Sequence, residues 1–597
     1  MIETALTYRL NEILANLLGA DFDDSAVLLQ KTRKEFEGDF TLVVFPFAKA
    51  AGMAPDPIAS KIGNLLMEKD GMVKSFNVIK GFLNIVLEPS VWVDFLRNEV
   101  ANSNYGFFPV KGGKPVVLEY SSPNTNKPLH LGHVRNNLLG FSVSRILEAS
   151  GKKVARVNLV NDRGIHICKS MIAWQKFGNG VTPASTGKKG DKLVGDYYVK
   201  FETELRKQST MLVNENNISE DEARKSAPLM KEAQEMLQKW EEGHPETIEI
   251  WKTMNSWVYE GFDATYSRLG VFFDKVYHES DTYLLGKKLV EEGLEQGVFA
   301  RRDDGSVWVN LTAEGLDEKL LLRSDGTSVY ITQDLGTAQL RFDDFDPGKM
   351  VYVVGNEQNY HFDVLKKVLK KLGKPYAESI FHLSYGMVEL PEGKMKSREG
   401  TVVDADDLMD EMIKTAKQTT EELGKVQELF EDNLVELYKT VGLGALKYFM
   451  LKVDPKKNML FNPAESIDFN GHTGPFIQYT HARIRSILRS AGNNSESFEF
   501  VNTMPPEKLS QKERALLRSI YQFPSVISEA ASELNPATVA NYAYDIAKEY
   551  NQFYHDHSVL NEPDPDVSKF RVALSKLTAT TIKNAMWLLG IDVPERM

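Results

Sequence analysis

The sequence is almost without cysteine: Cys168 is the single cysteine among its 597 residues. This excludes a disulfide framework and a cysteine-rich zinc site, and it fits a reducing compartment, so we expect a cytoplasmic protein. No apolar run approaches the roughly 18 residues of a membrane span, so we expect no membrane contact. Lys and Arg number 71 against 83 Asp and Glu, a net charge of −12, so any nucleic-acid contact must use a local basic patch.

Length and composition predict a large globular protein of about four structural units. Hydrophobic residues make up 42% and charged residues 26% of the chain, which leaves no room for a mainly disordered protein. We expect three domains. Residues 1–110 mix helices with short strands, residues 111–455 have an α/β pattern interrupted by a charged helical insertion at about 183–260, and residues 456–597 are helical.

The α/β pattern begins with a strand at 115–122, a loop, a helix from about residue 130, and a second strand at 153–160. This is the βαβ unit of a parallel sheet. A further buried strand is predicted at 349–356. Because ligands of open α/β sheets bind outside the carboxyl ends of the strands, we expect the functional groups there.

The first chemical motif lies where the first of these strands meets its helix. His130 and His133 are three residues apart and share the first helical turn, and Gly132 between them lets a ligand approach the backbone. The free N–H groups of a helix start favour a phosphate. Two histidines at this spacing are also typical of half a metal site, but no further ligand of the zinc type is spaced nearby.

A second motif, KMKSREG at 394–400, combines three cations with a terminal glycine. Taken alone, it is typical of an exposed basic turn. Downstream of the histidine motif in an α/β domain, it predicts a loop that closes over a triphosphate and stabilises the charge of departing pyrophosphate.

The string EYSSPNTNKPLHLGHVRN at 119–136 resembles the arginyl-tRNA synthetases, a family of class I aminoacyl-tRNA synthetases. The resemblance implies a Rossmann-like catalytic domain, an α+β N-terminal domain that contacts tRNA, and a helical anticodon-binding domain. It implies an arginine–tRNA ligase, expected to be a monomer, that uses ATP with Mg²⁺, L-arginine and tRNA(Arg), with no protein-bound metal. Ser397 departs from the family's second signature, where a lysine is usual; the resemblance implies that Lys127 compensates, and Lys396 is the rival candidate.

A site for arginine needs a carboxylate that accepts the forked guanidinium. Tyr330 and Asp334 lie four residues apart and would share a helix face, while Glu119 ends the first strand and Gln358 follows a later one. By resemblance, the arginine contacts are Glu119, Ser121, Asn124, His133, Tyr330, Asp334 and Gln358, with His361 as an additional candidate. The catalytic residues implied are His130, His133, Lys127 and Lys394, and the ATP contacts are His130, Gly132, His133, Asn136, Met387, Lys394 and Lys396.

The helical C-terminal part interleaves aromatic and basic residues, a pattern typical of a packed amphipathic helix and also of an RNA-binding surface. By resemblance, the candidate tRNA contacts are Arg485, Tyr542, Asn551 and Met597. Three alternatives stay open: another class I ligase, for example of the lysyl type; a small-molecule nucleotidylyltransferase, which shares the histidine motif but has no use for the helical C-terminus; and a non-catalytic tRNA-binding paralogue.

Overall fold

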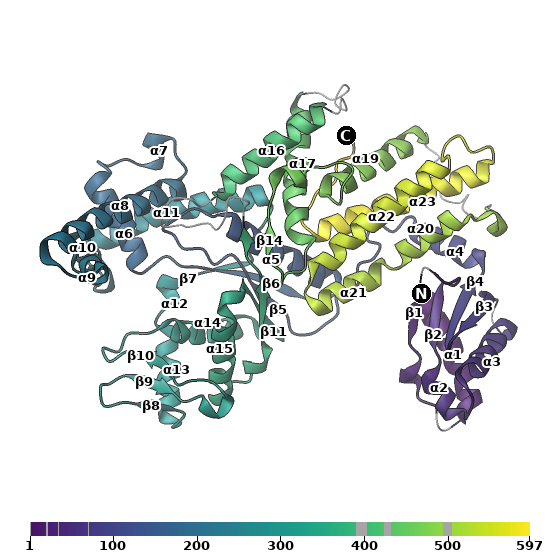
Figure 1. Ribbon diagram of the computed structural model, residues 1–597, viewed down its shortest axis with the longest axis horizontal. Helices are drawn as coiled ribbons and strands as arrows, with labels where there is room; N and C mark the ends of the chain where they lie inside the picture. Colours follow the sequence, from purple (N-terminus) through teal and green to yellow (C-terminus); the bar gives the residue numbers. More distant parts are fainter. Residues whose placement is uncertain are drawn as a thin grey trace.

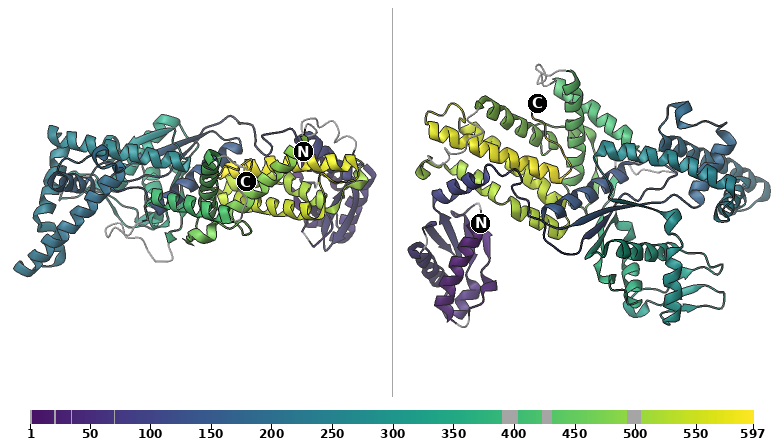
Figure 2. Two further views of the ribbon diagram at one scale, coloured as in Figure 1. Left: turned by 90° about the horizontal axis from the view of Figure 1, so that it is seen from above. Right: turned by 180° about the vertical axis from the view of Figure 1, so that it is seen from behind.

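The computed structural model describes residues 2–19, 22–33, 35–69, 71–389, 403–422, 431–492 and 504–597. Figure 1 shows a central parallel sheet between two groups of helices, with the N-terminal region beside the C-terminal helices. Seen from above, the molecule is elongated, with the insertion helices at one end and the N-terminal region at the other (Figure 2). The predicted fold class, a Rossmann-like α/β domain flanked by an α+β and a helical region, is confirmed.

The central sheet has the strand order β12-β11-β5-β6-β7, and all of its strand pairs are parallel. Its strands are β5 (Val116–Glu119), β6 (Val154–Val160), β7 (Lys275–His278), β11 (Lys349–Gly355) and β12 (Ile380–Tyr385). The chain first builds β5, β6 and β7 outward in one direction and later adds β11 and β12 on the other side of β5. The strand order therefore reverses at β5, which is where open α/β sheets form their ligand crevice.

Strand β5 is shorter than predicted, because it ends at Glu119 rather than near residue 122. Ser121 and Ser122 have φ of +79° and +45°, a left-handed conformation that no strand can contain. The neighbouring strands are longer: Glu119 pairs with Tyr352, and β11 continues to Gly355. Beyond Glu119, β11 continues for three more residues, about 10 Å at the usual rise of a strand, and we call this stretch of the carboxyl edge the notch.

The helices that frame the notch are α5 (Leu131–Ala149), α14 (Tyr330–Phe345) and α15 (Asn359–Lys371), as the sequence predicts. Helix α5 is buried along nearly its whole length because the C-terminal helices cover the side that does not face the sheet. Its second half holds the end of the chain, since Ser142 Oγ donates to the carbonyl of Leu588 at 2.9 Å and Arg145 to that of Trp587 at 2.7 Å.

Two insertions leave the sheet. The first is helical, as predicted for 183–260, and comprises α7 (Pro183–Thr186), α8 (Gly190–Asn216), α9 (Glu220–Ser226), α10 (Pro228–Glu241) and α11 (Pro245–Leu269), after α6 (Ile165–Phe177). The second follows α12 (Glu279–Thr282) and α13 (Leu285–Glu295) and is an antiparallel sheet of β8 (Phe299–Arg301), β9 (Val307–Val309) and β10 (Lys319–Leu322). In Figure 1 they extend from the same side of the central sheet.

The N-terminal region packs a four-stranded antiparallel sheet against helices. Its elements are α1 (Ile2–Leu18), β1 (Leu29–Lys31), β2 (Phe40–Val43), α2 (Phe45–Ala50), α3 (Pro55–Lys69), β3 (Val73–Ile79), β4 (Phe82–Leu87) and α4 (Pro89–Glu99). The fully buried Asp39 side chain forms ion pairs with Arg514 and Arg518 of the C-terminal region and accepts the backbone N–H of Leu87. One buried carboxylate therefore joins the two ends of the chain.

The C-terminal part is helical, and beyond Leu460 its described residues contain no strand. Its helices are α16 (Ala405–Glu422), α17 (Glu431–Leu451), α18 (Pro463–Ser466), α19 (Gly474–Ser490), α20 (Gln511–Tyr521), α21 (Phe523–Glu533), α22 (Pro536–Asp556) and α23 (Pro565–Leu588), and β14 (Met459–Leu460) pairs with β13 (Val388–Glu389). No helix in the described part of the chain is long and apolar enough to cross a membrane.

Candidate active site

The histidine motif lies at the carboxyl edge of the sheet, where β5 leads into α5. His130 is the N-cap of α5, and its Nδ1 accepts the N–H of Gly132 at 3.1 Å. His133 reaches back, and its Nδ1 accepts the N–H of His130 at 3.2 Å. Because both Nδ1 atoms accept, each neutral ring carries its proton on Nε2 and can donate it to a phosphate oxygen.

Gly132 leaves space beside the His130 ring. A Cβ at position 132 would lie 3.0 Å from Cε1 and 3.1 Å from Nδ1 of the His130 ring. The two histidine rings pack with their centroids 4.0 Å apart. A side chain at position 132 would press on the His130 ring, and the glycine avoids this contact.

Burial shifts the basic groups of this region toward their neutral forms. Burial, with a smaller contribution from nearby Lys127, lowers the pKa of His130 to about 4. Burial also lowers the pKa of His133, with His130 and Lys127 adding to the effect, and burial lowers the pKa of Lys127. Among the described residues no carboxylate pairs with Lys127, so its charge is available to an anionic ligand.

The segment that follows the second motif forms backbone hydrogen bonds with the histidine motif. The N–H of Leu131 donates to the carbonyl of Val403 at 3.1 Å, and the N–H of Ala405 donates to that of Leu129 at 2.9 Å. Ion pairs then join Asp406 of α16 to Lys189 at 2.6 Å and to Arg268 at 2.8 Å. The predicted ATP contacts Lys394 and Lys396 lie outside the described residues.

The predicted arginine pair lies on one face of α14, across the notch. Tyr330 begins the helix and is 80% exposed, and Asp334 follows one turn later. Asp334 Oδ2 lies 2.5 Å from Nε2 of His361, which is on α15. A carboxylate and an aromatic ring are thus presented to a ligand at the rim of the notch.

Glu119 lies deeper, at the floor of the notch, and is only 7% exposed. It forms an ion pair with Arg341 of α14, and its Oε1 accepts the Ser122 hydroxyl at 3.1 Å. Burial raises the pKa of Glu119, the Arg341 guanidinium opposes this shift, and Asp334 adds to it. A buried carboxylate of this kind costs free energy unless a cation and hydrogen bonds compensate it.

The loop between Glu119 and the histidine motif is held in its strained conformation by buried amides. Ser121 N–H donates to Asn136 Oδ1 at 2.5 Å and Ser122 N–H to Asn158 Oδ1 at 3.0 Å. The Ser121 hydroxyl lies 2.7 Å from that of Tyr266. Strained backbone of this kind persists where the surroundings over-determine it, commonly at ligand sites.

The remaining predicted contacts differ in exposure. Asn124 and Gln358 are exposed at the carboxyl edge, after β5 and β11 respectively. Asn136 is buried, and its Nδ2 donates to the carbonyl of Val353 at 2.7 Å, so it joins α5 to β11. Met387 is 41% exposed beyond β12, and its N–H donates to Asn458 Oδ1 at 2.8 Å.

The predicted tRNA contacts have partners within the chain. Arg485 pairs with Glu595, and Asn551 Oδ1 accepts from Arg483 at 2.6 Å. The Tyr542 ring stacks on that of Phe523, and its hydroxyl donates to the carbonyl of Ser519. Met597 packs against the core. All four belong to α19, α22 or the chain end that crosses them.

Two residues on the acidic side of the crevice, Arg341 and Glu279, were not predicted from the sequence. Arg341 lies eleven residues after Tyr330, which is three helical turns, so the spacing alone places it on the same face. Glu279 follows β7 directly, and burial raises its pKa to about 7, with Asp162 and Asp334 adding to the effect and Arg163 opposing it. Its position at the carboxyl end of a parallel strand was the available signal.

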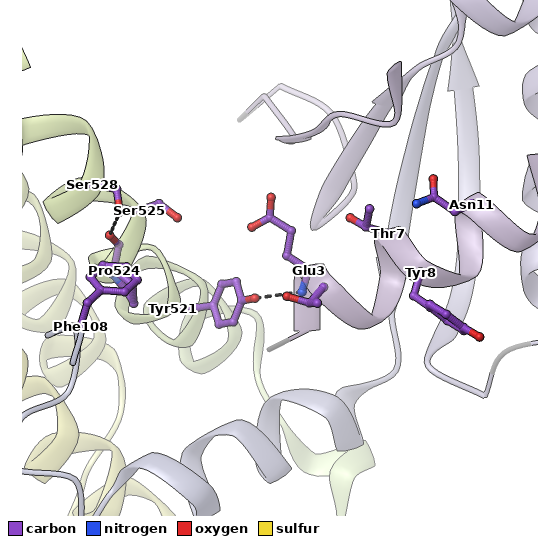
Figure 3. A pocket seen from close by; sticks show the side chains of 10 residues that line it. Glu3, Thr7, Tyr8, Asn11, Phe108, Tyr521, Pro524, Ser525 and Ser528 are labelled. Atoms are coloured by element: carbon purple, nitrogen blue, oxygen red, sulfur yellow. Dashed lines mark hydrogen bonds between the residues drawn. The ribbon is translucent and has the colours of Figure 1, made fainter. Parts of the chain in front are cut away.

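A pocket of about 630 Å³ lies away from this crevice, between α1 and the α20–α21 junction. Figure 3 shows Glu3, Thr7 and Asn11 of α1 on one side and Tyr521 and Ser525 on the other. It contains none of the predicted site residues. The concentration of buried ionisable groups therefore places the candidate active site in the crevice above β5, not in this pocket.

Comparison with known families agrees with the fold. A family model described as "tRNA synthetases class I (R), catalytic domain" matches residues 99–462, "DALR anticodon binding domain" matches 477–597, and "Arginyl tRNA synthetase N terminal domain" matches 2–87. The parallel sheet, the histidine motif at its switch point and the helical C-terminus thus define a class I aminoacyl-tRNA synthetase.

Individual relatives are more specific. The arginine–tRNA ligase of Parabacteroides distasonis is 56% identical over 604 residues and covers 100% of both chains. That of Flavobacterium psychrophilum is 56% identical over 589 residues and covers 97% of each. The arginyl-tRNA synthetase structure of Thermus thermophilus superposes with a TM-score of 0.81 at 25% identity over both full lengths. The chain therefore belongs to the arginyl-tRNA synthetases, a class I family of arginine–tRNA ligases.

Proposed function

We propose that this chain activates L-arginine with ATP and transfers it to tRNA(Arg), using the two sides of the crevice above β5 for the two small substrates. The guanidinium binds on the acidic side, at Asp334, Tyr330 and Glu119. The triphosphate binds on the basic side, at His130, His133 and Lys127. The observation that carries this assignment is the opposite charge of the two sides, which face each other across the point where the strand order reverses.

The first chemical step is an in-line displacement at phosphorus. An oxygen of the arginine carboxylate attacks the α-phosphorus of ATP, the bond from that phosphorus to the bridging oxygen breaks, and pyrophosphate leaves. ATP enters as its Mg²⁺ complex, so the ion belongs to the substrate. No side-chain nucleophile is needed, and the protein contributes positioning and charge stabilisation. The Nε2–H groups of His130 and His133 donate to phosphate oxygens, and Lys127 and Lys394 add positive charge.

The second step moves the arginyl group to RNA. The 2′-hydroxyl of the terminal ribose attacks the carbonyl carbon of arginyl-adenylate, the mixed-anhydride bond breaks, and AMP leaves with the electron pair. Asn124, Ser121, His133 and Gln358 hold the amino-acid backbone during both steps. Asn136 and Met387 complete the ATP side, together with Lys396.

The rest of the chain is assigned to tRNA. We divide it into an N-terminal tRNA-contacting domain at 1–110, a catalytic domain at 111–455 and an anticodon-binding domain at 456–597. Arg485, Tyr542, Asn551 and Met597 are the proposed RNA contacts of the last domain. The protein acts in the cytoplasm as a monomer. The relatives favour this function over a lysyl-type ligase or a nucleotidylyltransferase.

The test is pyrophosphate exchange into ATP with each of the twenty amino acids, with and without homologous tRNA. Exchange with arginine alone supports the proposal, and a requirement for tRNA would add that activation waits for the RNA. Exchange with another amino acid would contradict the proposed pocket. No exchange under any condition would favour a non-catalytic tRNA-binding role.

A further inference from the structure

Arg341 is a buried cation that no step of the reaction uses. Its side chain is 2% exposed, it pairs with Glu119, and it donates from NH1 to the Tyr352 hydroxyl at 3.1 Å. The rings of Tyr352 and Tyr277 both lie near the guanidinium, with centroids 5.1 and 5.7 Å from its central carbon. Burying a charge so fully costs free energy unless a partner compensates it. The role of Arg341 therefore depends on its ion-pair partner, Glu119.

The depth of Arg341 matches that of the carboxylate it holds. Arg341 lies seven residues after Asp334 on the same helix face, about 10 Å further along the axis at 1.5 Å per residue. Glu119 lies three residues below the end of β11, again about 10 Å. Asp334 therefore lies at the rim of the notch and the Glu119–Arg341 pair at its floor.

The charges of the notch leave room for one cation. With both carboxyls ionised, Asp334 and Glu119 contribute two negative charges against the one positive charge of Arg341, and Glu279 adds a further negative charge where it is ionised. Glu119 also keeps acceptor capacity, because a carboxylate has about four lone-pair sites and this one is used by Arg341 and the Ser122 hydroxyl. A single guanidinium entering from the rim would complete both the charge and the hydrogen bonds.

We propose that Arg341 is a positioning residue for arginine recognition, which keeps Glu119 ionised and fixed at the floor of the notch so that its free oxygen sites accept the guanidinium of the substrate. This inference rests on the proposed function, because it takes Glu119 as an arginine contact. Arg341 itself touches no substrate. Its effect must therefore depend on Glu119.

The electrostatics give the expected sign. Burial and Asp334 raise the pKa of Glu119, and Arg341 is the cation that opposes them. The other ionisable groups facing this carboxyl are Tyr352 of β11 and Tyr277 of β7, both with pKa values raised by burial and therefore neutral near pH 7. Removing Arg341 therefore favours the protonated form of Glu119, and a protonated carboxyl is a donor where the guanidinium needs an acceptor.

The experiment compares arginine KM in the aminoacylation reaction at about pH 7 and about pH 9 for wild type, Arg341→Met, Arg341→Lys and the double variant Glu119→Gln/Arg341→Met. We expect Arg341→Met to raise arginine KM at least roughly tenfold at the lower pH, with ATP KM unchanged, and the higher pH to recover much of the loss. Arg341→Lys should recover most of the affinity. The double variant should bind arginine weakly without the added pH dependence.

An unchanged arginine KM in folded Arg341→Met would overturn the inference, as would a pH dependence in the double variant as steep as that of Arg341→Met. If Arg341→Met does not fold, the double variant is the remaining test, because it buries no unpaired charge. An arginine KM equal to that of wild type in the double variant would then reject the role of the Glu119–Arg341 pair. The proposed function fails separately, since wild type would then give no arginine-dependent aminoacylation.

Discussion

The two sides of the crevice bury charge of opposite sign, and they differ in what neutralises it. On the acidic side, Glu119 pairs with Arg341 and Asp334 contacts His361, so each of these carboxylates has a partner within the chain. On the basic side, Lys127, His130 and His133 cluster at the start of α5, and among the described residues no carboxylate pairs with them. Burial shifts groups on both sides toward neutrality, raising the pKa of Glu119 and lowering those of Lys127, His130 and His133.

This difference suits the two ligands. Arginine brings one positive charge, and the acidic side keeps one negative charge unmatched. ATP brings several negative charges that increase on the leaving pyrophosphate, so a basic side left uncompensated stabilises the transition state more than the ground state. Internal pairing serves selective binding, whereas the unpaired Lys127 and the Nε2–H donors of His130 and His133 serve the chemical step.

The largest expected effect comes from the acidic side. Asp334→Asn should raise the KM for arginine on the order of 10³-fold, because the variant loses the charge-assisted hydrogen bonds to the guanidinium, and should leave the KM for ATP within about threefold. Steady-state aminoacylation measures both. Asp343→Asn, an exposed change on the same helix, is the control. Equal increases in both KM values would show that the two sides do not act separately.

The basic side should respond in rate rather than in arginine affinity. Lys127→Met should slow arginyl-adenylate formation roughly hundredfold, because a buried cation near the phosphates is lost, with little change in arginine KM. Single-turnover measurement of adenylate formation separates the two quantities. Lys153→Met, an exposed lysine beyond α5, should behave as wild type. A defect confined to arginine KM would assign Lys127 to arginine binding instead of to the phosphates.

Local sequence patterns predicted where the histidine pair and the Tyr330–Asp334 pair lie, but not the ion pair between Glu119 and Arg341. The strand-to-helix junction placed His130 and His133 on one turn, and the four-residue spacing placed Tyr330 and Asp334 on one face; both placements are confirmed. The Glu119–Arg341 pair joins residues 222 positions apart; the spacing from Tyr330 places Arg341 on the same helix face, but no local signal identifies Glu119 as its partner. The end of β5 at Glu119 depends on the left-handed serines, which buried amides of α5 and β6 hold.

The two sides should also differ in their response to pH. The pKa of Glu279 is raised to about 7, so this group is neutral below that pH and becomes negative above it, which strengthens the attraction for arginine. Arginine KM should therefore fall several-fold, roughly three- to fivefold, between about pH 6 and pH 8. His130, with its pKa lowered to about 4, stays neutral over this range, so it should contribute no pH dependence to ATP KM.

Glu279→Gln should remove most of this pH dependence of arginine KM, while Glu295→Gln, an exposed carboxylate on α13, should retain it. Both variants are measured under saturating Mg²⁺ and ATP across the pH range. If Glu279→Gln keeps the pH dependence of arginine KM seen in wild type, another group titrates over this range. Glu279 then does not contribute to arginine binding on the acidic side.

The smallest effect is expected far from both sides. Arg485 on α19 forms a half-exposed ion pair with Glu595, a kind of contact worth little to stability. Arg485→Ala should raise the KM for tRNA about two- to threefold and lower the salt dependence of tRNA binding by about one phosphate contact, while the arginine and ATP constants remain unchanged. Arg97→Ala, which breaks a comparable surface pair with Asp94 on α4, is the matched control. A change in arginine KM in Arg485→Ala would mean that the helical region influences the acidic pocket directly, and the comparison would then need three interacting regions rather than two.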